Sequence, residues 1–407
     1  MVEVRDQRDW HRQYAELVLR LCLDFEPGQV LLIDGQIEHA PFIRVLVDEG
    51  YRLGARYVDV WYWEPHGKRA RIRYAPEETL SWIPTWLNER YGSMEEQNAA
   101  LVSVRGDAEP DLLSGLDQRR AALDLMPAVP ARVRAQQSSK VPWTIVGYPT
   151  PGWAELVFGE PDTERLAGLL RTFLRLDEPD PVAAWRERWA LMHQKAAALN
   201  AQRFEAMRLV GPGTDLQVGL LPQSRWGVAD LKTHSGRRFI PNLPTEEVYT
   251  TPDRARVDGV VSCTLPLVLD GTVIHDLRLT FENGRAVNVE ASTGAELVRQ
   301  HMATDEGAAR LGEIALVDKT SRIGASGLTF YTTLLDENAA CHLAWGSGIP
   351  TGIEGGATMS DAALDDIGVN RSVVHVDFMV GAPEVEVLGV RGDGETASVL
   401  RDNEWQI

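Results

Sequence analysis

The sequence predicts an α/β fold that changes to α+β in its second half. In the first 150 residues, short apolar runs alternate with amphipathic segments, which is the order of βαβ units and therefore of a parallel sheet. In the second half, Asp270-Gly271 and Asn283-Gly284 each separate two short β-rich runs, the strongest short-range signal for a β-hairpin. We therefore expect an N-terminal α/β domain with a parallel sheet and a β-rich C-terminal domain.

The first half contains the elements of a βαβ unit in the expected order. An amphipathic helical pattern over residues 7–24 comes first, and the turn Glu26-Pro27-Gly28 ends it. The elements predicted after this turn are a strand over Val30–Asp34, a helix over roughly 39–54, and strands over Tyr57–Trp61, Leu101–Val104 and Thr144–Tyr148.

The boundary between the two domains is predicted near residue 209. A long helical pattern from about 180 to 209 meets the breaker cluster Gly211-Pro212-Gly213. This cluster lacks the Gly-Lys-Ser/Thr of a phosphate-binding loop, so we interpret it as a linker turn. The predicted domains are residues 1–209 and residues 210–407, and within the second we expect a further helix over 296–311.

Composition excludes several classes of function. The chain of 407 residues has a formal net charge of −18, which argues against a general affinity for nucleic acid or anionic membranes. No apolar run approaches the ~20 residues of a membrane span. The charged N-terminus is unlike a signal peptide, and the three cysteines form no C-x-x-C pair. We expect a cytoplasmic protein that has neither a nucleic-acid partner nor a membrane partner.

Carboxylates and imidazoles recur beside apolar runs in the last third of the chain. In the run Val373–Gly381, alternation along a strand places His375 and Asp377 on one face. Charged groups in such a strand are costly unless something pairs with them, and a divalent cation is one solution. The candidate ligands, enough for two such ions, are Glu247, Glu313, Glu337, His342, His375 and Asp377.

Each of these side chains also has a purely structural interpretation. His375 and Asp377 can satisfy one another within a sheet, and a Gly-Glu pair such as that at Glu313 is common where a strand starts. Acidic residues such as Glu246-Glu247 are favoured at the N-terminus of a helix. The segment Asp336–Asn338 can cap a helix that carries Cys341 and His342. From the residues alone, both interpretations remain open.

Four motifs resemble those of the aminopeptidase T / aminopeptidase S family of dinuclear metallopeptidases, in the family's order and at close to its spacings. These motifs are Asn242–Pro252, Leu311–Val317, Asp336–His342 and His375–Gly381. The likeness extends upstream to Gly54-Ala55-Arg56 and Gly152-Trp153-Ala154, so it covers essentially the whole chain.

The resemblance implies a ligand set, an activity and an assembly. Two divalent metal ions would be bound by Glu247, Glu313, Glu337, His342, His375 and Asp377, with spacing favouring Glu247 over Glu246. The enzyme would remove N-terminal residues from peptides, and it would form a homodimer whose active site lies in an internal cavity. Residues 210–407 would then be the catalytic, metal-binding domain.

The function we expect is that of a metal-dependent aminopeptidase acting through a water molecule activated at a dinuclear site. Glu313 or Asp377 would bridge the two ions, and Glu313 is the expected general base, a role that requires one of its oxygens to stay free of tight coordination. Zinc, cobalt and manganese all accept mixed nitrogen and oxygen ligands, so each is a candidate cofactor. The substrate would be a peptide or a small amide.

One position departs from the family pattern. Seven residues after His342 the family has a tyrosine, whereas this chain has Ile349, which cannot donate a hydrogen bond. This departure suggests a weakened hydrolase or binding protein for an unusual small amide as an alternative. Another is a mononuclear iron dioxygenase like the related enzyme that opens the ring of 2,5-dihydroxypyridine. Its iron ligands would be His342, His375 and Asp377, but retention of Glu247 and Glu313 favours two metals and hydrolysis.

Overall fold

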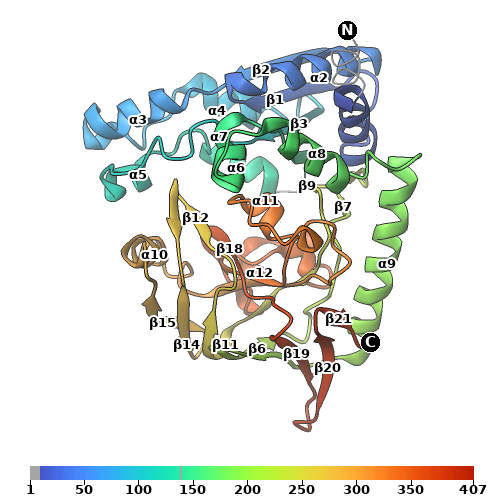
Figure 1. Ribbon diagram of the computed structural model, residues 1–407, viewed down its shortest axis with the longest axis vertical. Coiled ribbons are helices and arrows are strands. Elements are labelled where there is room, and N and C mark those ends of the chain that lie inside the picture. The colour runs from blue at the N-terminus through green and yellow to red at the C-terminus, as the bar shows by residue number, and fades with distance from the viewer. Residues whose placement is uncertain (1–9, 138–139) are drawn as a thin grey trace. The chain divides into compact units, whose positions relative to one another are not determined.

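The computed structural model describes residues 10–137 and 140–407, and the chain divides into two compact units (Figure 1). The first unit consists of Met1–Arg186 and Asp230–Pro244, and the second consists of Glu187–Ala229 and Thr245–Ile407. Helix α9, Pro181–Gln202, begins in the first unit and ends in the second.

The first unit is built on a five-stranded sheet in which every pair of neighbouring strands is parallel. The strand order is β2-β1-β3-β4-β9, and the central strand β3 is buried along almost its whole length, as expected where helices cover both faces of a sheet. The strands are β1 Val30–Gly35, β2 Tyr57–Tyr62, β3 Ala99–Arg105, β4 Trp143–Gly147 and β9 Asn242–Leu243. The predicted parallel α/β architecture is therefore confirmed.

The helices of the first unit begin at recognisable caps. Thr150 accepts a hydrogen bond from the backbone N–H of Trp153, and Asp162 accepts one from that of Arg165. The described helices after α2, Ala40–Arg52, are α3 Pro65–Tyr74, α4 Thr85–Gly92, α5 Gln118–Leu123, α6 Pro130–Gln137, α7 Pro151–Phe158 and α8 Thr163–Phe173. A short hairpin, β7 Leu231–Lys232 with β8 Arg238–Phe239, completes the unit.

The helix predicted over residues 7–24 is helical from residue 10, with a π-helical stretch over Leu17–Cys22. Residues 7–9 lie outside the part of the chain that the structure describes.

The prediction of a helix over 180–209 is wrong at its C-terminal end. Arg203 adopts a left-handed conformation with φ of +52°, which ends the helix, and Ala206–Gly211 forms strand β5 instead. Strand β5 pairs with β6, Thr214–Leu220, so Gly211-Pro212-Gly213 is the turn of a hairpin rather than a linker.

The second unit contains two larger antiparallel sheets. The eight-stranded sheet has the order β15-β14-β11-β6-β5-β19-β20-β21 and the four-stranded sheet has the order β10-β16-β17-β18. Strands not yet given are β10 Val248–Thr250, β11 Pro252–Ser262, β12 Leu267–Leu269, β13 Thr272–Ile274, β14 Arg278–Glu282, β15 Arg285–Glu290, β16 Leu311–Leu316, β17 His342–Gly346, β18 His375–Met379, β19 Glu386–Val390, β20 Thr396–Arg401 and β21 Glu404–Trp405.

Both predicted hairpins are present. Asp270-Gly271 joins β12 to β13 and Asn283-Gly284 joins β14 to β15. All four turn residues have positive φ, from +49° to +80°, as a type I′ turn requires. The β-rich C-terminal half is therefore confirmed.

The helix predicted over 296–311 is shorter than expected. Helix α10 spans Ala295–Met302, and the carboxylate of Asp305 then accepts hydrogen bonds from the N–H groups of Gly307 and Ala308. This side chain stabilises a turn in place of further helix. The other helices of the unit are α11 Thr333–Asp336 and α12 Asp361–Asp366.

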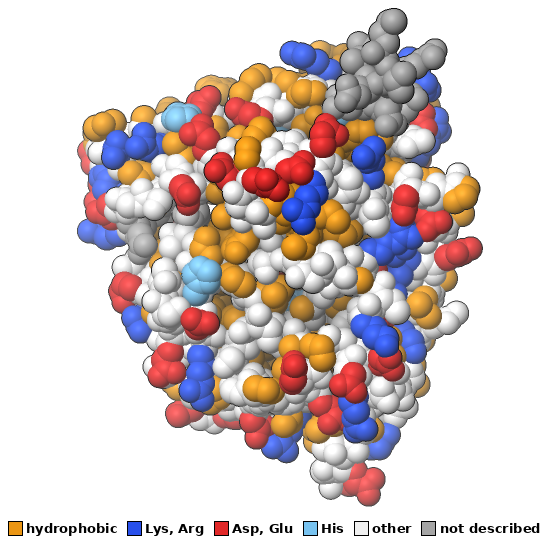
Figure 2. Space-filling model, in the orientation of Figure 1, with side chains coloured by type: hydrophobic (Ala, Val, Ile, Leu, Met, Phe, Trp, Pro, Cys, Tyr) orange, Lys and Arg blue, Asp and Glu red, His pale blue; other side chains and the backbone are white. Residues whose placement is uncertain are grey.

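On the face shown in Figure 2, Asp and Glu side chains are interspersed with Lys and Arg side chains. Among the described residues, no helix combines the length and the apolar character needed to cross a membrane.

Candidate metal centre

The four-stranded sheet places three candidate ligands together through its register. Glu313 on β16 lies opposite Ala344 on β17, and Ala344 lies opposite Asp377 on β18. Side chains at opposite positions of antiparallel strands share a face, and so do residues two apart along one strand. Glu313, Asp377 and His375 therefore project from the same face, and the small Ala344 leaves space between them.

The same face carries His342 and Glu247. His342, the first residue of β17, lies opposite Ala315, which is two residues after Glu313. Ala315 also lies opposite Tyr249 on β10, and Glu247 precedes Tyr249 by two positions. Alternation thus directs Glu247 to the side of the sheet on which His342 lies.

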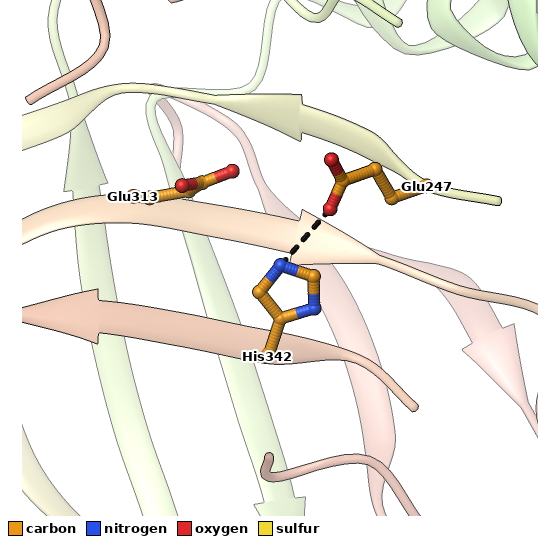
Figure 3. Close-up of side chains that lie close together, drawn as sticks. All are labelled: Glu247, Glu313 and His342. Atoms are coloured by element: carbon orange, nitrogen blue, oxygen red, sulfur yellow. Dashed lines mark ion pairs between the residues drawn. The ribbon is translucent and has the colours of Figure 1, made fainter. Parts of the chain in front are cut away.

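The side chains meet in two groups that share one carboxylate. Ligand atoms of Glu247, Glu313 and His342 lie within 4.8 Å of one another, and so do those of Glu313, His375 and Asp377. Nε2 of His342 faces Oε2 of Glu247 at 3.0 Å (Figure 3). Nε2 of His375 lies 3.1 Å from Oε2 of Glu313 and 3.4 Å from Oδ1 of Asp377. Glu313 is therefore the residue common to both groups.

Both imidazoles are oriented by the main chain. Nδ1 of His342 lies 3.2 Å from the carbonyl oxygen of Ala340, and Nδ1 of His375 lies 2.8 Å from that of Ser347. A carbonyl only accepts, so each Nδ1 carries the proton. In the neutral ring Nε2 then keeps its lone pair, the arrangement usual for a metal-binding histidine. Sequence reasoning missed these two carbonyls because backbone groups leave no signal in residue identity.

The glycine before Glu313 is required by a close approach of the backbone. A Cβ atom at Gly312 would lie 2.3 Å from the carbonyl oxygen of Ser347, far inside van der Waals contact. This is the carbonyl that orients His375. Gly312 also falls where the register between β16 and β17 shifts, so the Leu-Gly-Glu sequence serves both strand pairing and the histidine.

Glu337 belongs to neither group of mutually close ligand atoms, although it is buried nearby. It directly follows α11, and its side chain accepts a hydrogen bond from the amide of Asn338 at 3.3 Å. Burial raises the pKa of Glu337 well above its usual value, and the charges of Asp377 and Glu247 raise it further. The carboxylate is therefore within electrostatic reach of the centre.

The neighbouring acid Glu246 has a different partner. Its Oε2 lies 2.7 Å from Nε of Arg188, and both side chains are buried. Glu246 is thus paired with a cation on α9, whereas Glu247 faces His342. Neither residue starts a helix, because the strand β10 begins at Val248, so that structural interpretation is wrong.

The interpretation in which Asp336–Asn338 caps a helix carrying His342 is also wrong. Helix α11 ends at Asp336, and His342 begins strand β17. The side chain of Asp336 accepts hydrogen bonds from the N–H groups of Phe330 and Thr332 and so fixes the loop before α11.

Burial and mutual charge set the pKa values of the site. Burial raises the pKa of Glu313 to about 7, and the charges of Glu247 and Asp377 add to the effect of burial. Burial alone would lower the pKa of His342, but the hydrogen bond and charge of Glu247 raise it to about 10. In the same way Asp377 and Glu313 outweigh burial and hold the pKa of His375 well above its usual value.

The donor set fits divalent cations. Among the described residues of the site, four carboxylates face two imidazoles, so with every carboxylate ionised negative charge would remain in excess even when both rings are protonated. Buried charge without compensation costs several kcal/mol per ion. Divalent cations would balance this excess, and carboxylate oxygens with imidazole nitrogens are the ligands that zinc, cobalt and manganese accept. These atoms are candidate ligands for such ions.

This cluster of acids and imidazoles has the donor atoms of a metal-dependent hydrolase, and the family that the chain matches is one of metallopeptidases. The sequence profile of the thermophilic metalloprotease family (M29) matches residues 8–405, and the chain belongs to this family.

Characterised relatives cover nearly the whole chain. It is 40% identical over 404 residues to Aminopeptidase T of Thermus thermophilus, with 97% of each chain covered. It is 37% identical over 406 residues to Aminopeptidase 2 of Geobacillus stearothermophilus, covering 97% of this chain and 98% of the relative. The solved structure of wild-type AmpT from Thermus thermophilus superposes with a TM-score of 0.87 at 39% identity, covering 98% of this chain and 99% of that one. The predicted resemblance is confirmed.

We predict that metal binding competes with protons. In the metal-free protein the raised pKa values keep His342 and His375 protonated at neutral pH, so a metal ion must displace both protons. Both imidazoles bind their protons more tightly than free imidazole does. The affinity of the site for metal ions should therefore fall as pH decreases from 8 to 5. Each displaced proton contributes about tenfold per pH unit. Calorimetric titration of Zn²⁺ in buffers of different ionisation enthalpy measures both the affinity and the protons released.

The variant His275→Gln is the matched control, since His275 is an exposed imidazole in the same unit. It should release as many protons as wild type. Metal affinity that stays constant from pH 8 to 5, with no proton release, would contradict the assignment of both histidines.

Proposed function

We propose that the protein is a metal-dependent aminopeptidase with a dinuclear centre, which releases N-terminal residues from peptides. The observation that carries this proposal is the pair of ligand groups that share Glu313. Two sites joined by one carboxylate suit a pair of divalent ions. The residues proposed to bind them are Glu247, Glu313, Glu337, His342, His375 and Asp377.

Divalent ions bound at this site would supply Lewis acidity and lower the pKa of a bound water molecule. Glu313 is the proposed general base because it belongs to both ligand groups, and this role requires that one of its oxygens stays free of tight coordination to metal. It would accept the proton of the attacking water and return it to the leaving amine. The carbonyl groups of Ala340 and Ser347 keep both imidazoles in the tautomer that leaves Nε2 as the ligand atom.

The relatives support hydrolysis over the alternatives. Relatives that match nearly the whole chain are named aminopeptidases, among them those of Thermus thermophilus and Geobacillus stearothermophilus. A mononuclear dioxygenase centre would use His342, His375 and Asp377 and would leave the carboxylate of Glu247 without a metal. His342 lies in the group with Glu247, whereas His375 and Asp377 lie in the other group, and this separation favours two ions over one.

The finer features of this enzyme are also proposals. The metals would be zinc, cobalt or manganese, since all three accept the mixed donor set. We place the enzyme in the cytoplasm as a homodimer, with residues 210–407 as its catalytic domain and a peptide or small amide as its substrate.

Ile349 lies beside the candidate centre in an apolar cluster. It packs against a buried group formed by Tyr249, Ala229 and Ala315. The hydroxyl of Tyr249 lies 2.7 Å from Oγ1 of Thr351. Burial raises the pKa of this phenol, and the charges of Glu313 and Glu247 contribute. A tyrosine hydroxyl is therefore present near the carboxylates although position 349 has none.

We predict that Glu313→Gln abolishes turnover without unfolding the protein. The amide is nearly isosteric but is neither a base nor an anionic bridge, and loss of a general base typically costs about 10²–10⁴ in rate. Turnover of a leucine amide by metal-loaded protein, together with the thermal unfolding midpoint, measures both effects. Glu282→Gln, which changes an exposed carboxylate on β14, should leave the rate unchanged. A Glu313→Gln enzyme with wild-type turnover would remove Glu313 from the mechanism.

We also predict that Ile349→Tyr increases turnover of simple leucine or alanine amides. A missing hydrogen-bond donor to an oxyanion costs about 10²–10³ in rate, so restoring one should recover part of that factor. Tyr249→Phe should lower the wild-type rate, because Tyr249 lies on the strand face that carries the candidate ligands. Rates are compared at equal metal loading.

Tyr331→Phe is the third variant of this comparison, because Tyr331 is the second tyrosine that we propose as a local substitute for the missing hydrogen-bond donor. Tyr331 is a half-buried residue of the loop before α11 and has no strand position on that face. High wild-type turnover that none of the three substitutions changes would contradict the role given to position 349.

A further inference from the structure

Asn338 is a fully buried amide that links two segments of the candidate metal centre. Its Oδ1 accepts a hydrogen bond from the backbone N–H of Glu246 at 2.6 Å, although these two residues are 92 positions apart. Its Nδ2 donates to Oε1 of Glu337 at 3.3 Å and to the carbonyl oxygen of Leu334 at 3.1 Å. One side chain thus contacts the main chain next to Glu247 and the carboxylate of Glu337.

These contacts use both functional ends of the amide. An asparagine side chain offers an acceptor oxygen and two N–H donors, and here the oxygen and both donors have partners. Aspartate at this position would keep an acceptor but lose the donors, and alanine would lose both. Because an unsatisfied buried polar group is costly, the amide holds its partners at fixed separations.

The two segments are fixed further on either side of Asn338. The carbonyl oxygen of Asn338 accepts a hydrogen bond from Oγ of Ser321 at 2.5 Å. The side chain of Glu246 is held by Arg188, whose Nη2 also lies 3.5 Å from Oδ1 of Asp318. With the main chain and side chain of Glu246 both held, the next residue, Glu247, is directed toward His342.

We propose that Asn338 is a positioning residue of the metal centre, which sets the separation of Glu247 from Glu337. It contacts no metal itself and acts through these two carboxylates. This inference rests on the proposed function, since it assumes that both carboxylates bind metal. A side chain with a structural role alone would affect stability and leave metal affinity unchanged.

The test is the affinity of metal-free Asn338→Ala for Zn²⁺, measured by calorimetric titration of the full chain beside its thermal unfolding midpoint. Loss of a residue that orients metal ligands typically lowers metal affinity about 10–100-fold, and we expect a loss in this range. The absorption spectrum of the Co²⁺-loaded variant should also differ from that of wild type, because the ligand geometry changes.

Asn200→Ala is the matched control. The side-chain amide of Asn200 also links two segments of the second unit. Its Nδ2 donates to the carbonyl oxygen of Trp226 and its Oδ1 accepts from the backbone N–H of Trp226, each at 2.9 Å. It makes these contacts to the main chain alone. Asn200→Ala should lower the unfolding midpoint and keep wild-type Zn²⁺ affinity.

Zn²⁺ affinity within twofold of wild type in Asn338→Ala would overturn the inference, and so would an equal loss in Asn338→Ala and Asn200→Ala. If Asn338→Ala does not fold, Asn338→Asp decides the question, because it keeps the acceptor for Glu246 and places a carboxylate against Glu337. A loss of tenfold or more in that variant supports the inference, and wild-type affinity overturns it. A wild-type protein that binds no Zn²⁺ would refute the proposed function instead.

Discussion

The second unit is organised around an excess of buried negative charge. Glu247, Glu313, Glu337 and Asp377 are all nearly inaccessible to solvent, and only two imidazoles are available to balance them. In the metal-free protein, protons compensate, as the raised pKa values of Glu313 and both histidines indicate. Divalent cations that bind to the same ligand atoms would displace these protons and balance the negative charge of the carboxylates.

The four-stranded sheet supplies the rigidity that such a cluster needs. Glu313, His342, His375 and Asp377 lie on three adjacent strands, so their separations follow from strand spacing and register rather than from mobile loops. The small Ala344 occupies the middle of this face and leaves room for the longer side chains around it. Glu247 and Glu337 come from segments outside the paired strands, and buried polar contacts hold these segments in place.

Much of this arrangement could be predicted from the sequence because it depends on local patterns. The alternation around His375 and Asp377 predicted a shared strand face, and the Asp-Gly and Asn-Gly pairs predicted both hairpins. The family motifs also pointed to Glu313 and Asp377, which the register of the strands places on the same face of the sheet. Local patterns failed where tertiary contacts decide the outcome. The chain over 206–209 continues a helical pattern but forms β5, because β6 and β19 offer pairing partners.

Contacts between distant segments could not be predicted from one sequence. The parallel pairing of β9 with β4 and the amide of Asn338 on Glu246 join positions about a hundred residues apart, and nothing local marks them. The central claim, a dinuclear centre joined by Glu313, is tested most directly by counting metal ions. Metal-free protein reloaded with Zn²⁺ and freed of excess ions would be analysed for zinc per chain by mass spectrometry. The account predicts two ions per chain in wild type, and a single ion or none would contradict it.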